Sequence, residues 1–152
     1  TMTIGAAGVK IYEQLPNAGI FSTDLEMNYR LTPQWRWRGR LSYQRGTGKD
    51  AGNLPLMQPL TYTSGLTFST GKYTAELTLN GAARQKHFSP DFGETPAASY
   101  RVFHLSATGK FRSFLLKTGV ENLLDTYYST YTDWNRIPRM GRNVFFNVIR
   151  SF

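Results

Sequence analysis

Aromatic and arginine residues concentrate between positions 125 and 141, and this stretch is the best candidate for ligand contact. Rings stack on flat or cationic groups, and guanidinium groups bind anions through paired hydrogen bonds. The candidate contact residues are Tyr127, Tyr128, Tyr131, Trp134, Arg136 and Arg139. The competing interpretation is an aromatic belt with loop packing and no direct ligand contact.

Two histidines and two loop methionines are the remaining side chains that could hold a metal or a chelate. His87 opens a loop beside Phe88 and is a candidate ligand contact, against the simpler reading of an exposed loop histidine. His104 falls on the polar side of an expected strand. Met57 and Met140 are soft donors suited to copper, but packing is the favoured interpretation of two isolated methionines. We therefore expect no metal site and no cofactor.

No catalytic constellation is visible, so we expect that the protein is not an enzyme. Asp24 and Glu26 share a face with an arginine row, which favours ion pairing over general acid and base catalysis. Ser64-Gly65 lies in neither a phosphate loop nor a nucleophile elbow. The chain has 0 Cys, which removes thiolate chemistry and disulfides.

The composition fits one domain with an unusual aromatic content. The chain has 152 residues, 14% aromatic side chains and a formal net charge of +8, which is compatible with nucleic acid, an anionic membrane surface or an acidic ligand. No apolar run approaches the roughly 18 residues that a membrane-spanning helix needs, so a helical membrane protein is excluded.

The elements that must position these residues are strands, because the dominant rhythm has period two. In 20–31, apolar side chains alternate with polar ones, and the alternation resumes in 35–44 after a Thr-Pro-Gln turn. Pairing the two segments about that turn puts Tyr29 beside Trp37 and Glu26 beside Arg40. The apolar and polar faces agree on this one register.

Further strands are expected at 61–70, 73–80, 100–109, 114–121 and 143–152, with a weaker one at 8–14, which makes about eight. Short turns alternate with long loops at 46–60, 87–98 and 125–141. Transmembrane β-barrels have short periplasmic turns, long outer loops and strands of roughly 9 to 11 residues. The sequence therefore predicts an all-β, antiparallel, up-and-down transmembrane barrel segment.

Two segments near the C-terminal end resemble TonB-dependent outer-membrane receptors. Residues 119–125, Gly-Val-Glu-Asn-Leu-Leu-Asp, are similar to the family's G-V-x-N-L-F-D segment, and 137–143 resemble its P-x-G-R entry into the last strand. The Leu-Thr-Pro-Gln-Trp turn at 31–35 fits more loosely. The resemblance implies a receptor of about 22 strands whose N-terminal plug engages the TonB complex. Residues 1–152 would then be the C-terminal part of its barrel, without the plug and the earlier strands.

The basic row Arg36, Arg38 and Arg40 has three readings: a water-filled lumen, attraction of an anionic substrate or the plug, or nucleic-acid binding. We favour the lumen, since the same strand places Trp35, Trp37 and Tyr43 on its opposite face. A nucleic-acid platform would interleave rings and charges on one face. No nucleic acid is expected.

The resemblance implies a location in the outer membrane of a Gram-negative cell, in contact with its lipid. The function it implies is import of a bulky, scarce nutrient: siderophore iron, haem, cobalamin or a metal chelate. The alternatives are a complete small eight-stranded outer-membrane barrel and a soluble ligand- or nucleic-acid-binding β-barrel. The isolated segment would have open edges, which favour closure or edge-to-edge self-association.

Overall fold

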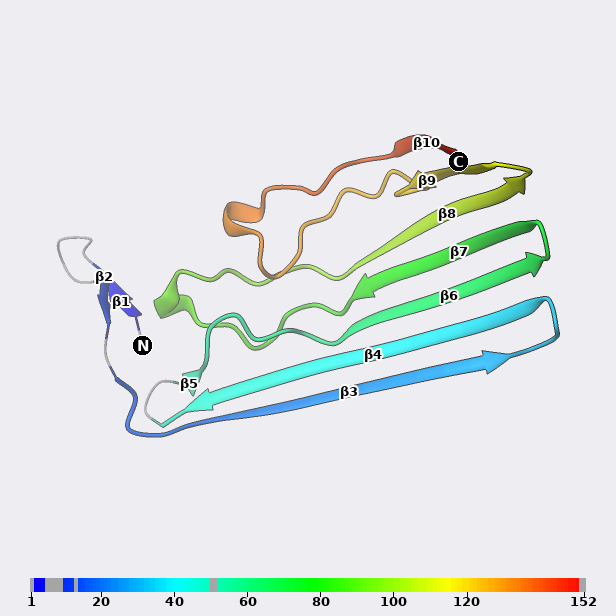
Figure 1. Ribbon diagram of the computed structural model, residues 1–152. Helices are drawn as coiled ribbons and strands as arrows, with labels where there is room; N and C mark the ends of the chain where they lie inside the picture. The colour runs from blue at the N-terminus through cyan, green and yellow to red at the C-terminus, as the bar shows by residue number, and fades with distance from the viewer. Residues whose placement is uncertain (1, 5–9, 13, 50–51, 151–152) are drawn as a thin grey trace.

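The computed structural model describes residues 2–4, 10–12, 14–49 and 52–150, and its main feature is one long antiparallel sheet (Figure 1). Neighbouring strands follow the order β10-β9-β8-β7-β6-β4-β3, and the short β5 (Gly52–Asn53) pairs with β4 as the eighth strand. The long strands are β3 (Ala18–Arg30), β4 (Trp35–Gly48), β6 (Thr61–Thr70), β7 (Tyr73–Ala82), β8 (Tyr100–Phe111), β9 (Phe114–Glu121) and β10 (Asn143–Arg150). The expected all-β meander is confirmed.

Outside this sheet the described elements are short. β1 (Met2–Ile4) pairs with β2 (Lys10–Tyr12) in a separate two-stranded sheet. The weak strand expected at 8–14 is thus found only as β2, and its other residues 8, 9 and 13 lie outside the described part. Two 3-10 turns, η1 (Pro90–Phe92) and η2 (Trp134–Arg136), lie in the long loops. Among the described residues, no helix is long and apolar enough to cross a membrane.

The pairing of β3 with β4 follows the predicted register. Tyr29 lies opposite Trp37, and Glu26 lies opposite Arg40. Carried across the sheet by the remaining registers, this alternation places Leu25, Trp37, Leu77 and Phe146 on one face, called here the apolar face. The other face, called the polar face, carries the row Arg36, Arg38 and Arg40, and also His104.

The apolar face is not covered by any other layer of the described chain. Leu25 is 50% exposed and Phe146 is 66% exposed, whereas the buried hydrophobic residues among those described are only Ala82, Ala97 and Val102. So large an exposed apolar surface marks a membrane or protein contact. A soluble barrel would need a filled apolar interior, which the described residues do not form.

The two edges of the sheet are β3 and β10, and in the described part of the chain they do not pair with each other. A closed small barrel would join its first and last strands. The sheet of Figure 1 is instead open, with a free backbone edge along each side.

All three long loops lie at one end of the sheet, and the short turns lie at the other (Figure 1). The loops join β4 to β6, β7 to β8 and β9 to β10. β4 is longer than predicted, because β3 begins at Ala18 and pairs as far as Gly48. The glycine at position 46 suggested a loop there, but it lies in the strand opposite Ile20. The side chains of Leu54 and Met57 occupy the space that a Cβ would need at this position.

Candidate functional site

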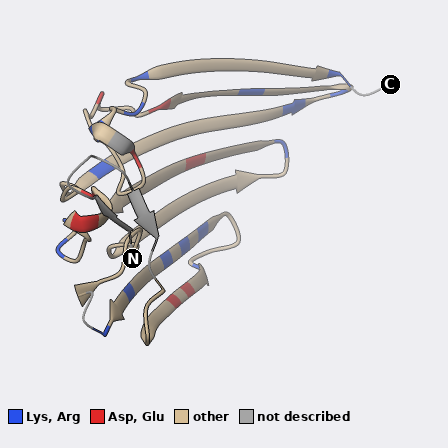
Figure 2. Cartoon of the chain, turned by 90° about the vertical axis from the view of Figure 1, so that its left-hand side faces the viewer, with Lys and Arg blue, Asp and Glu red and all other residues tan. Residues whose placement is uncertain are grey.

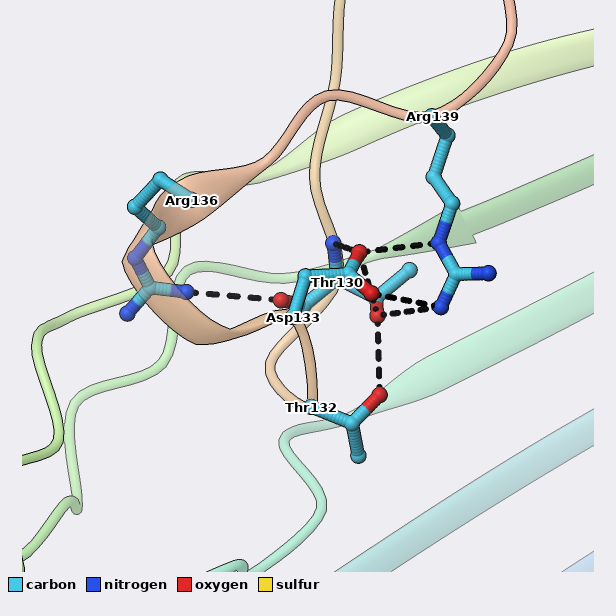
Figure 3. Close-up of polar contacts among 5 residues, drawn as sticks. All are labelled: Thr130, Thr132, Asp133, Arg136 and Arg139. Atoms are coloured by element: carbon cyan, nitrogen blue, oxygen red, sulfur yellow. Dashed lines mark hydrogen bonds and ion pairs between the residues drawn. The ribbon is translucent and has the colours of Figure 1, made fainter.

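The third long loop, 122–142, is held in shape by the carboxylate of Asp133 (Figure 3). Arg139 approaches it with two nitrogens, Nε at 2.8 Å from Oδ2 and Nη2 at 2.6 Å from Oδ1. The backbone N–H and the hydroxyl of Thr130 also donate to Oδ2, at 2.7 and 2.9 Å. A carboxylate with this many charge-assisted and neutral donors fixes the loop geometry.

Arg136 joins this loop to the second one. Its Nε donates to the hydroxyl of Thr95 at 3.0 Å, and its Nη1 donates to the carbonyl of Thr130 at 3.3 Å. The backbone N–H of Arg139 donates to the carbonyl of Tyr128 at 2.8 Å. Both arginines predicted to contact a ligand therefore have structural partners within the loops.

The same contacts shift the pKa values in this loop. Burial alone would raise the pKa of the Asp133 carboxyl, but the hydrogen bonds from Arg139 and Thr130 outweigh it and hold that pKa below its usual value. The hydrogen bond and charge of Asp133 raise the pKa of Arg139. Asp133 and Arg139 are therefore both charged throughout the physiological pH range.

The four aromatic candidates differ in how far solvent reaches them. Tyr127 is 83% exposed, whereas Tyr128 is half-buried with its ring centroid 4.7 Å from that of Tyr100. Tyr131 is half-buried, and burial raises the pKa of its hydroxyl. Trp134 lies in η2, but its side chain is outside the described part of the structure. Among the three candidate rings that the structure describes, Tyr127 is thus the most exposed.

His87 lies apart from this aromatic group, in a hollow between the first and second loops. The hollow has a volume of about 170 Å³, and Tyr43, Met57 and Gln85 also line it. Gln85 is 2% exposed, and its Oε1 accepts no hydrogen bond from any residue that the structure describes. A second hollow, where Tyr131 and Arg136 meet Glu94, measures about 20 Å³ and has no room for more than a water molecule.

Glu94 is a residue of the loop cluster that the sequence did not single out. Its Oε1 accepts from the backbone N–H of Leu56 and its Oε2 from that of Ser89, both at 2.7 Å. One carboxylate therefore ties the first loop to the second. A single glutamate in a polar loop gives no sequence signal for this role, because its partners are backbone groups 38 and 5 residues away.

The two family-like segments contact each other. Asn122 is 3% exposed, and its Nδ2 donates to the carbonyls of Thr126, at 2.9 Å, and Met140, at 3.2 Å. Asp125 accepts from the backbone N–H of Arg142 through Oδ1 at 2.7 Å. The Asn and Asp of the first segment thus satisfy backbone groups of the second, at Met140 and Arg142.

The basic row lies beside acidic and amide side chains on the polar face. Arg40 forms an ion pair of 3.3 Å with Asp24, and Nε of Arg38 donates to Asn28 at 3.0 Å. Figure 2 shows the row as blue bands along β4 beside the red bands of β3. Arg40 therefore pairs diagonally with Asp24, although Glu26 is its register neighbour.

Solved structures of known receptors contain the same sheet. The copper transporter OprC superposes with a TM-score of 0.82 and 27% sequence identity over 89% of this chain and 24% of its own. The sheet matches a segment of a TonB-dependent receptor barrel. This receptor-barrel segment spans about a quarter of the length of the proteins it matches.

Two further receptors share the fold of this sheet. The ferric yersiniabactin uptake receptor FyuA from Yersinia pestis superposes with a TM-score of 0.69 and 19% identity, over 86% of this chain and 23% of its own. The ferric-catecholate import receptor Fiu from E. coli K12 superposes with a TM-score of 0.68 and 17% identity, over 97% of this chain and 22% of its own. No protein-family model and no curated protein sequence matches the chain.

The matched proteins are transporters of the Gram-negative outer membrane and not enzymes, which confirms the predicted location and class. Within the described residues, no group of three or more His, Asp or Glu side chains could hold a metal ion. The ligand contacts expected from the sequence stay predictions.

Proposed function

We propose that residues 1–152 are the C-terminal part of the barrel of a TonB-dependent receptor that imports a scarce nutrient across the outer membrane. The match to OprC carries this proposal, because it combines the highest TM-score among the three receptors with 27% identity over 89% of the chain. The nutrient class is siderophore iron, haem, cobalamin or a metal chelate. A plug and earlier strands, encoded outside this sequence, would contact the TonB complex and complete the wall.

The two faces of the sheet have separate roles in this proposal. The apolar face meets lipid. Moving exposed side chains such as Leu25 and Phe146 from water into lipid lowers the free energy of the protein. The polar face lines a water-filled lumen, where Arg36, Arg38 and Arg40 stay solvated and face the plug. The free edges of β3 and β10 pair with the missing strands, or with a second copy when the segment is isolated.

The long-loop end is the outer end, and it contacts the nutrient before import. The candidate contacts are Tyr127, Tyr128, Tyr131, Trp134, Arg136, Arg139 and His87. Tyr127 is the first to test because it is 83% exposed. Copper is the first metal to test, because OprC is a copper transporter and Met57 and His87 line one hollow.

The test uses the full-length receptor gene in its native host. Deleting the gene lowers cell-associated copper, or uptake of one ferric siderophore, haem or cobalamin, under limitation for that nutrient. Deleting the energy-transducing partner lowers uptake to the same level. Unchanged uptake of all these nutrients in the receptor deletion would refute the proposed function.

Two single variants then separate ligand contact from loop structure. Tyr127→Ala raises the nutrient concentration needed for half-maximal uptake, because a stacking ring is lost. Ile137→Ala is the matched control in the same loop, 65% exposed and without a ring. Equal uptake by both variants and the wild type would remove Tyr127 from the contact set.

A further inference from the structure

A second cluster of positive charge lies at the short-turn end, around the turns that join β6 to β7 and β8 to β9. Lys72, Lys110, Arg112 and Arg150 line an open hollow of about 470 Å³, called here the rim hollow. None of the described residues that line it is acidic. Figure 2 shows blue at the turns joining β6 to β7 and β8 to β9, with no red among them.

The backbone brings these cations together. The N–H of Lys110 donates to the carbonyl of Lys72 at 2.9 Å, which joins the two neighbouring turns. Arg112 occupies the second turn with φ of 47°, in the left-handed region. Arg150 lies opposite Phe114 in the β9/β10 register, and its guanidinium lies 5.8 Å from the centroid of the Phe114 ring.

The rim hollow also has an aromatic lining on the apolar face. The rings of Tyr73 and Phe111 meet edge to face, with centroids 5.7 Å apart. Phe111 and Phe114 are register partners, and each is 44% exposed. Rings of this kind at a strand end lie at the level of the lipid headgroups, where Lys and Arg also reach the interface.

We propose that the rim hollow binds the headgroup of an anionic phospholipid in the periplasmic leaflet of the outer membrane. This rests on the proposed orientation, in which the short turns are periplasmic. Three of these cations, Lys72, Lys110 and Arg112, have no acidic partner among the described residues. Such cations suit a phosphate, which arginine binds through paired hydrogen bonds. The rings beside them contact the upper acyl chains.

The basic row on the polar face differs from the rim hollow in its partners and in the face of the sheet that it occupies. Arg40 already has Asp24 as a counter-charge, and Arg38 donates to Asn28. That row also faces away from the apolar surface. In the described part of the chain, the rim hollow alone combines several cations with exposed rings of the apolar face.

The test is a lipid titration of the full-length receptor in detergent, followed by native mass spectrometry. Phosphatidylglycerol and phosphatidylethanolamine with identical acyl chains compete in equal amounts. We expect selective retention of phosphatidylglycerol. The double variant Lys72→Gln with Arg112→Asn lowers its apparent affinity about tenfold, since each interfacial cation contributes a several-fold factor. Asparagine is chosen at position 112 because it tolerates positive φ.

The matched control is Arg30→Gln with Arg36→Gln, which removes two cations beside the β3/β4 turn at the same end but on the polar face. This control leaves phosphatidylglycerol affinity unchanged. Equal affinity for the two lipids, or equal losses in both double variants, would overturn the proposal. Displacement of the lipid by millimolar inorganic phosphate would also overturn it, as a simple phosphate site.

The titration contains no nutrient and no TonB complex. A failed titration therefore leaves the import proposal standing. Failed uptake, conversely, leaves the lipid affinities interpretable.

Discussion

The indole N–H of Trp37 donates a hydrogen bond of 2.9 Å to the hydroxyl of Ser64 on the neighbouring strand. These two residues are not register partners, since Trp37 lies opposite Leu66 and Ser64 lies opposite Gly39. The indole reaches Ser64 by lying across Gly39, where an added Cβ would be 2.6 Å from the ring. The glycine therefore makes the hydrogen bond geometrically accessible, and the bond satisfies two polar groups on the apolar face.

Gly39→Ala is expected to displace the indole and break this hydrogen bond. Overpacking together with the lost bond destabilises the receptor by about 1–3 kcal/mol, measured as a lower urea midpoint in lipid vesicles. Gly19→Ala is the matched control, because nothing lies within 4 Å of an added Cβ there. If both variants unfold at the same urea concentration, the close approach of the indole to Gly39 does not contribute to the free energy of unfolding.

The two faces of the sheet give a second prediction. Leu77 lies midway along β7 on the apolar face, and Thr78 lies next to it on the polar face. Leu77→Arg is expected to cost about 2–4 kcal/mol, because a charge then meets the middle of the bilayer. Thr78→Arg exposes the same charge to the lumen and costs less than about 1 kcal/mol.

The measurement is again urea unfolding in lipid vesicles, with tryptophan fluorescence as the readout. Equal costs for the two arginine variants would contradict the assignment of one face to lipid.

The alternation of side chains was enough to predict most of the sheet. The bounds of β6 and β9 match the predicted ones, and the β3/β4 register was predicted from agreement of the two faces. Side chains that alternate with period two are typical of strands. A slip of one residue in the pairing would move every side chain of a strand to the other face of the sheet. The C-terminal end of β4 was missed, because a glycine-rich sequence does not show that a partner strand continues.

The loop contacts were not predictable in the same way. Spacing suggested Arg136 and Arg139 as ligand contacts, whereas the structure gives them Thr95, Thr130 and Asp133 as partners. These contacts depend on how three loops meet at one end of the sheet. The alternation of residues within a strand does not predict such contacts between loops. The resemblance located Asn122 and Asp125 as motif residues but gave no reason for them.

The contact between the two family-like segments gives the third prediction. A Cβ at Gly141 would lie 2.7 Å from Oδ1 of Asp125, the atom that accepts from the backbone N–H of Arg142. Gly141→Ala is therefore expected to break that hydrogen bond. The amide of Arg142 should exchange with deuterium about tenfold faster, which corresponds to about 1.4 kcal/mol of local stability.

Asp125→Gly supplies the test of mechanism, since glycine tolerates the φ of 54° at that position. Without the carboxylate, Gly141→Ala meets no obstacle, and its additional effect on exchange should disappear. Additive effects of the two substitutions would show that they act independently.

The carboxylate of Asp133 makes the third loop sensitive to acid. Its pKa is lowered in the folded loop by Arg139 and Thr130, despite the opposing effect of burial. The pKa of an aspartate in the unfolded chain is about 3.9. The ionised Asp133 carboxylate therefore contributes fully to stability above that pH, and this contribution is lost as the pH falls through the lower pKa of the folded loop. Arg139 stays charged throughout, since its pKa is raised.

The measurement is deuterium exchange of the loop amides between pH 7 and pH 2, corrected for intrinsic rates. The N–H of Thr130 donates to Asp133, and the N–H of Arg139 donates to Tyr128. Both amides should lose protection below about pH 4, by about tenfold for a hydrogen bond to a charged group. In Asp133→Asn the protection should be lower at pH 7 and independent of pH. A wild-type loop whose corrected exchange is the same across this range is not held by the ionised carboxylate, and Arg139 would then be available to a ligand.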